Sequence, residues 1–124
     1  MAQNLKVLAV DDDLINLKLL KSMLMKTESV KEVIEARNGA DAINILKDRN
    51  DIDIILLDII MPVMGGIEML KVVRSDDNLK QLPIIVLTTD ETKKNEALEA
   101  GANGFLMKPV RAADVTQKIS ELSL

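Results

Sequence analysis

The clearest chemical signal in this sequence is a set of carboxylates that directly follow apolar segments. Asp58 comes immediately after the apolar residues 54–57, and the apolar residues 7–10 are followed by three consecutive acids at 11–13. An unpaired buried carboxylate costs several kcal/mol or takes up a proton, so such acids need a partner. If the two segments are neighbouring strands, their acids meet at one edge of a sheet, where a hard cation is expected between them.

Composition narrows the chemistry that is open to the chain. Its 124 residues carry a formal charge of −4, and the longest basic run is the pair Lys93 and Lys94, which argues against a nucleic-acid surface. The chain has no cysteine and no histidine, so neither a thiolate nor an imidazole can act as a nucleophile, base or metal ligand. Residues 1–6 lack a signal-peptide layout, and no apolar run approaches the roughly 20 residues that cross a bilayer. We expect a cytoplasmic protein that binds neither nucleic acid nor membrane.

Strand and helix patterns alternate along the whole chain. The first, third and fourth predicted strands are apolar almost throughout, which is typical of a parallel sheet with helices on both faces. The apolar spacing predicts strands at residues 5–10, 32–36, 53–58, 83–88 and 103–107, and helices at 13–26, 40–49, 66–75, 92–100 and 111–122. Ligands of such sheets bind at the carboxyl ends of the strands, where the sequence places Asp11, Asp12, Asp58, Thr88 and Lys108.

Four motifs at these strand ends resemble the receiver domain of two-component response regulators. They are VDD at residues 10–12, LDIIMPVMGG at 57–66, LTT at 87–89 and GANGFLMKP at 101–109. The resemblance covers essentially the entire chain, so we expect residues 1–124 to form a single receiver domain, similar to single-domain chemotaxis regulators. It implies a flavodoxin-like α/β fold with a five-stranded parallel sheet in the order 2-1-3-4-5, flanked by five helices. It also implies an aspartate that takes a phosphoryl group from the phosphohistidine of a kinase.

The resemblance further implies a magnesium site at the acidic edge. Asp12 and Asp58 would bind Mg²⁺ directly, the backbone carbonyl of Ile60 would be a third protein ligand, and Asp11 would act largely through water. Magnesium prefers six oxygens, keeps several waters and takes one or two carboxylates, which agrees with this set. Asp13 is instead expected to start the following helix, because an acid is favourable at the positive N-terminal end.

Asp58, Thr88 and Lys108 form the expected reacting set. An aspartyl nucleophile brings an anion toward an anionic phosphoryl group, so catalysis must consist of positioning and charge cancellation. By resemblance, Asp58 is the phosphoacceptor, while the Thr88 hydroxyl and the Lys108 ammonium each donate to a phosphoryl oxygen. Each residue also has a plainer interpretation. Asp58 could be an incidental turn residue, Thr88 an ordinary hydroxyl at a strand end, and Lys108 a solvated amine in a loop. A cis bond before Pro109 is possible but does not follow from the sequence.

Phe105 is the only aromatic residue of the chain. It is either a core side chain or, as the resemblance implies, a residue whose orientation is coupled to Thr88. Gly65 and Val110 stand where receivers often carry an acid and a phenylalanine. Gly65 affects the start of the following helix more than metal binding. Val110 leaves undecided which surface contacts the downstream protein.

Two classes of function remain open. The first is a signalling receiver that exchanges phosphate with a histidine kinase or phosphotransfer protein, binds a downstream target protein, and catalyses only its own phosphorylation and dephosphorylation. The second is a small phosphatase of the haloacid-dehalogenase type, which also uses an aspartyl nucleophile and Mg²⁺ but usually carries a D-x-D motif on its first strand. A flavin carrier is disfavoured, because the chain has no Trp or Tyr and no glycine-rich phosphate loop.

Overall fold

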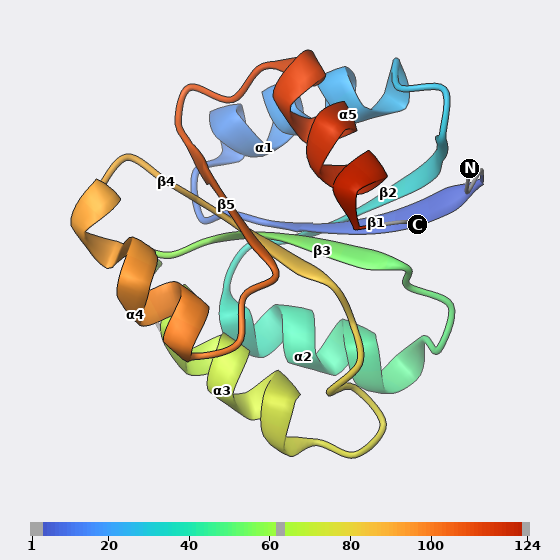
Figure 1. The fold of residues 1–124 in the computed structure, drawn as a ribbon. Helices are drawn as coiled ribbons and strands as arrows, with labels where there is room; N and C mark the ends of the chain where they lie inside the picture. The colour runs from blue at the N-terminus through green and yellow to red at the C-terminus, as the bar shows by residue number, and fades with distance from the viewer. Residues whose placement is uncertain (1–3, 62–63, 123–124) are drawn as a thin grey trace.

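The computed structural model describes residues 4–61 and 64–122, so Pro62 and Val63 of the motif after Asp58 lie outside the described residues. Strands and helices alternate as predicted (Figure 1). The strands are β1 (Leu5–Val10), β2 (Val30–Ala36), β3 (Ile54–Asp58), β4 (Ile84–Thr88) and β5 (Gly104–Met107). The helices are α1 (Leu14–Met25), α2 (Gly39–Asp48), α3 (Gly66–Ser75), the 3-10 turn η1 (Glu91–Lys93), α4 (Lys94–Glu99) and α5 (Ala112–Glu121). No helix in the described part is long and apolar enough to cross a membrane.

The strands form one parallel sheet in the order β2-β1-β3-β4-β5, which confirms the predicted topology. Figure 1 shows α1 and α5 on one face of the sheet and α2, α3 and α4 on the other. Side chains of β3 alternate between the faces: Ile55 and Leu57 join the core beneath α2 and α3, whereas Ile54 and Leu56 join the core beneath α1 and α5. Every residue of β3 and β4 is buried, which explains their continuous apolar sequences.

The start of α1 follows directly from its capping residue. The Asp13 carboxylate accepts hydrogen bonds from the backbone N–H groups of Ile15 and Asn16, at 2.9 and 3.2 Å. This confirms that Asp13 starts the helix, because an N-cap acid satisfies N–H groups that have no partner within the helix. The cap turns the chain into α1 just after Asp11 and Asp12, and so holds these two acids in the β1–α1 loop.

Two predicted boundaries differ from the structure by two residues, and the others by one residue at most. β2 begins at Val30 rather than at residue 32, because Val30 pairs with Leu5 across a shift in the strand register. The helix predicted at residues 92–100 is only α-helical from Lys94 to Glu99. Asp90 caps the preceding η1 by accepting the N–H of Thr92, so the segment starts as a tight 3-10 turn. The helix ends one residue before the predicted end, and Gly101 follows it with a positive φ of 111°, as expected for the residue that stops the helix.

The beginning of α3 lies against the end of β3. The N–H of Gly66 donates to the Ile59 carbonyl at 2.8 Å. A Cβ atom at Gly66 would lie 2.5 Å from the carbonyl oxygen of Asp58 and 2.7 Å from the Cα of Ile59. Only glycine permits this approach without a shift of the backbone. Gly66 therefore helps to fix the position of Asp58.

Candidate functional site

Three buried polar side chains meet at the carboxyl edge of the sheet. Asp11, Asp58 and Thr88 are only 3%, 7% and 1% exposed, and they are the buried polar or charged residues of the described chain. Asp11 directly follows β1, Asp58 ends β3 and Thr88 ends β4. Because these strands are hydrogen-bonded neighbours, the fold brings together three residues that lie far apart in the sequence. The structure thus places these predicted site residues at one edge.

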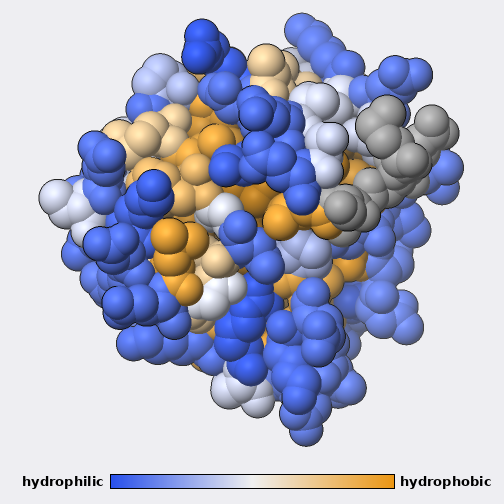
Figure 2. Space-filling view, viewed as in Figure 1, coloured by the Kyte–Doolittle hydropathy of each residue, from blue (hydrophilic) through white to orange (hydrophobic). Residues whose placement is uncertain are grey.

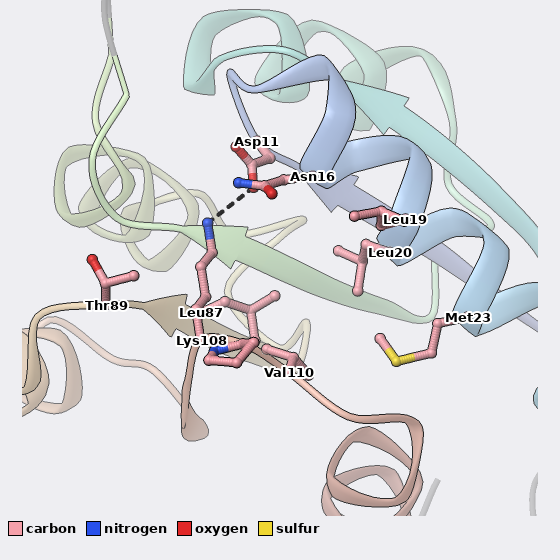
Figure 3. A pocket seen from close by; sticks show the side chains of 10 residues that line it. Asp11, Asn16, Leu19, Leu20, Met23, Leu87, Thr89, Lys108 and Val110 are labelled. Carbon is pink, nitrogen blue, oxygen red and sulfur yellow. Dashed lines mark hydrogen bonds and ion pairs between the residues drawn. The ribbon is translucent and has the colours of Figure 1, made fainter.

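Lys108 joins the two buried acids. Its Nζ atom lies 3.0 Å from Oδ2 of Asp11 and 3.1 Å from Oδ1 of Asp58, and Figure 3 shows the side chain reaching from the end of β5 toward Asp11. Its backbone N–H donates to the Thr88 carbonyl at 2.8 Å, which ties Lys108 to β4. The Lys108–Pro109 peptide bond is cis. Lys108 is therefore a fixed cation within the acidic edge and not a solvated loop amine.

Burial and charge act against each other in this site. Burial raises the pKa of Asp58 above its ordinary value, Asp11 raises it further, and the nearby Lys108 ammonium opposes the increase. Burial alone would lower the pKa of Lys108, but its hydrogen bond to Asp11 and the charge of Asp58 raise it above the ordinary lysine value. Lys108 is therefore protonated at neutral pH. A single ammonium then faces several carboxylates, which leaves negative charge unmatched.

The acids of the site can also hold a metal ion. Asp11, Asp12 and Asp58 each offer a carboxylate oxygen, and these oxygens lie within 4.8 Å of one another. Asp12 is exposed, which leaves the cluster open to solvent and to an entering ion. Clustered carboxylate oxygens with excess negative charge fit a hard divalent cation such as Mg²⁺. Ile60 lies two residues beyond Asp58 with an exposed side chain, and its carbonyl as a ligand stays a prediction.

Thr88 is connected to the segment that leads into α4. Its hydroxyl oxygen accepts the backbone N–H of Asp90 at 3.1 Å, and Asp90 in turn caps η1. Phe105 lies on β5, packs partly buried against the core beneath α2, α3 and α4, and has the Lys94 ammonium 6.0 Å from its ring centroid. Phe105 is thus a packing residue in contact with α4, and its coupling to Thr88 stays a prediction.

Sequence reasoning missed two features of this edge. We expected Lys108 to donate to a phosphoryl oxygen, and in the structure its ammonium also bridges Asp11 and Asp58. We also overlooked Asn16, which lines a cavity together with Asp11 and Lys108. A lone amide between Ile15 and Leu17 was the available signal, but its place in the cavity depends on how the tertiary fold brings α1 near the segment that follows β5.

Comparisons with known proteins agree with this fold and site. A family model described as the response regulator receiver domain matches residues 7–120. The chemotaxis protein CheY-3 of Vibrio cholerae is 34% identical over 122 residues, which cover 97% of this chain and 92% of that protein. The structure of Vibrio cholerae CheY4 has a TM-score of 0.84 at 34% identity, and covers 94% of this chain and 97% of its own.

One solved structure bears on the metal. It is the receiver domain of the sensor histidine kinase PA1611 from Pseudomonas aeruginosa, which holds a magnesium ion in its active site cleft. It has a TM-score of 0.83 at 27% identity, and the match covers 98% of this chain and 97% of that one. A protein of the same fold thus holds Mg²⁺ in its cleft.

Proposed function

Because the chain belongs to the response regulator receiver domain family, we propose that it accepts a phosphoryl group on Asp58 from a histidine kinase or phosphotransfer protein, and that phosphorylation changes its affinity for a downstream protein. The observation that carries the proposal is the 3.1 Å ion pair between Asp58 and Lys108 at a buried, acidic sheet edge. Family membership favours this function over the haloacid-dehalogenase-type phosphatase that the sequence left open.

Asp58 is the nucleophile in this proposal. One of its carboxylate oxygens attacks phosphorus, and the bond between phosphorus and the donor breaks as the new bond forms. Gly66 lets α3 approach so closely that the backbone of Asp58 is held in place, and burial on β3 limits its side-chain motion. Fixed orientation of this kind lowers the barrier, because little freedom is lost in the transition state.

Lys108 and Thr88 would stabilise the transferring group. The ammonium of Lys108 already contacts Asp58, so it lies where negative charge increases during the reaction. The Thr88 hydroxyl accepts the Asp90 N–H through its oxygen, which leaves its proton available for a phosphoryl oxygen. These two donors come from neighbouring strands and would contact different phosphoryl oxygens.

Asp12 and Asp58 would hold Mg²⁺ through their carboxylates, with the carbonyl of Ile60 as a further ligand and Asp11 acting through water. When bound there, the ion supplies positive charge that offsets the charge of the phosphoryl oxygens. The acid cluster supports this assignment, because its oxygens converge within 4.8 Å and one ammonium does not neutralise them.

Intact-mass measurement with acetyl phosphate and Mg²⁺ tests the proposal. We expect the wild-type chain to gain the mass of one phosphoryl group, and the gain to disappear on Asp58→Asn and on removal of Mg²⁺ by a chelator. Asp77→Asn is a matched control, because the Asp77 side chain is 93% exposed. An adduct of unchanged yield on Asp58→Asn would refute Asp58 as the acceptor. Sustained turnover of a phosphate monoester would favour the phosphatase alternative.

A further inference from the structure

A groove opens beside the acidic edge, between α1 and the segment that connects β5 to α5. Figure 3 shows the side chains that line it, and its volume is about 410 Å³. This is within the range of about 300–1,000 Å³ that is typical of small-molecule sites. We call it the α1 groove. None of the residues proposed to act in phosphoryl transfer accounts for its apolar part.

One end of the α1 groove is polar and belongs to the reacting site. Asp11 and Lys108 line this end, together with the amide of Asn16, and Figure 3 shows all three side chains close to one another. The Lys108 ammonium is also 3.1 Å from Asp58. Asp58 itself does not line the groove, so a molecule at this end lies beside Lys108, one side chain away from the phosphoacceptor.

The other end of the α1 groove is apolar. Leu19 and Met23 line it from α1, and Val110 lines it from the segment after β5. Leu19 is 65% exposed, so the fold leaves this wall uncovered. Figure 2 shows hydrophobic surface in the area between α1 and the β5–α5 segment. An occupant that uses both ends has a group that the Lys108 ammonium can contact, such as a phosphoryl oxygen, and an aliphatic chain along α1.

We propose that the α1 groove binds the aliphatic chain of acyl phosphates, so that medium-chain acyl phosphates are better phosphodonors than acetyl phosphate. The inference rests on the proposed function and names a substrate class for the same site. Its support is the continuity of an apolar, chain-sized groove with Lys108, which contacts Asp58, and with Asp11, whose carboxylate lies beside that of Asp58.

The reaction balances without another reactant. A carboxylate oxygen of Asp58 attacks phosphorus, the bond between phosphorus and the acyl oxygen breaks, and its electron pair leaves with that oxygen as a free carboxylate. An acyl phosphate dianion and the Asp58 anion become an aspartyl phosphate dianion and a carboxylate anion, so no proton or electron is left over. The chain stays on the leaving carboxylate, in the α1 groove, until the product departs.

Rates of phosphorylation by acetyl, butyryl and hexanoyl phosphate test this inference. Straight-chain carboxylates are nearly equal as leaving groups, so a difference in rate constant reports binding of the chain. Each fully buried methylene is worth about fourfold in binding. With partial burial, we expect the second-order rate constant for hexanoyl phosphate to exceed that for acetyl phosphate by about tenfold or more. Free hexanoate should inhibit the reaction at concentrations where acetate does not.

Leu19→Gln is the variant that tests the groove wall. Leu19 is an exposed residue of α1, so glutamine is tolerated by the helix but removes apolar surface. We expect the ratio of hexanoyl to acetyl rate constants to fall toward one. Ile15→Gln is the matched control, because Ile15 is 72% exposed on the same helix and does not line the groove. It should keep the wild-type ratio.

The two proposals fail in different ways. Equal rate constants for all three donors, with Asp58 still phosphorylated, would overturn the acyl groove and leave the function intact. The groove would then be assigned to an apolar side chain of a protein donor. A chain-length preference that Ile15→Gln loses as fully as Leu19→Gln would also overturn it. Absence of phosphorylation by every donor would overturn the proposed function and this inference together.

Discussion

Lys108 lies between two carboxylates that repel each other, and this position suggests two roles. Without a phosphoryl group, its ammonium bridges Asp11 and Asp58 and reduces their repulsion. When a phosphoryl group approaches Asp58, the same cation is already in place to offset the incoming charge. The Lys108 side chain is therefore already ordered before phosphorylation. Little conformational entropy would then be lost in the transition state, which would favour the reaction.

Lys108→Ala should consequently slow phosphorylation by acetyl phosphate by about 10²–10³-fold, the effect of removing one oriented donor from a developing oxyanion. Circular dichroism should show an intact fold, because the lysine lies at the sheet edge and not in either hydrophobic core. Lys71→Ala, at an exposed position of α3, controls for the loss of a positive charge. An unchanged rate for Lys108→Ala would remove this residue from the mechanism.

The junction of β3 and α3 is where the elements fix the site most tightly. A Cβ atom at Gly66 would meet the backbone of Asp58 and Ile59, whereas a Cβ atom at Gly65 would have its nearest contact at 3.4 Å. We expect Gly66→Ala to lower the free energy of unfolding by about 1–3 kcal/mol, the usual cost of overpacking, and to slow phosphorylation. Gly65→Ala should change both much less. Urea denaturation of the two variants gives the comparison, and equal midpoints would contradict it.

Local patterns explain why most elements could be predicted and a few could not. The buried strands β3 and β4 are apolar throughout, so both their existence and their parallel arrangement follow from the sequence. The start of α4 could not be predicted, because it depends on the Asp90 cap and on the link from Asp90 to Thr88. The α1 groove was equally hidden, since its walls come from segments about 90 residues apart that only the tertiary fold brings together.

At the scale of the whole molecule, charges gather at both ends of the sheet with different effects. The amino end carries a half-exposed network in which Asp51 contacts Lys6 at 2.8 Å and Arg49 at 2.9 Å, while Arg49 also contacts Glu32. Hydrogen bonds from Arg49 and Lys6 hold the pKa of Asp51 well below its ordinary value. Within this network each acid faces a cation, whereas the opposite end of the sheet keeps acids that one ammonium does not match.

Asp51→Asn should make stability less sensitive to acid. A lowered pKa in the folded state gives stabilisation above the ordinary carboxyl pKa of about 4, and that stabilisation is lost as the pH falls through the folded value. The variant should therefore melt below wild type at pH 7, and the difference should shrink as the pH falls below about 4. Asp77→Asn, which changes a 93% exposed acid on the surface, should show little difference at either pH. A melting difference for Asp51→Asn that is independent of pH would contradict the network's role.

The output of the site also belongs to the whole molecule. A phosphoryl group on Asp58 would recruit the Thr88 hydroxyl, whose oxygen now accepts the N–H of Asp90 at the start of η1. Movement there would be passed to Lys94 in α4 and to the ring of Phe105 beneath it. We expect such a change to be a shift between two populated arrangements, with the active one sampled weakly before phosphorylation.

Thr88→Ala should therefore separate phosphorylation from signalling. With beryllofluoride and Mg²⁺, the wild-type chain should show chemical-shift changes around Asp58 and also in α4 and β5. In Thr88→Ala, changes around Asp58 should remain while those in α4 and β5 become much smaller, because the hydroxyl that reports the phosphoryl group to η1 is lost. Thr88→Ser keeps the hydroxyl and should retain the wild-type pattern. If α4 and β5 are silent in the wild-type protein, the chain does not signal through this face.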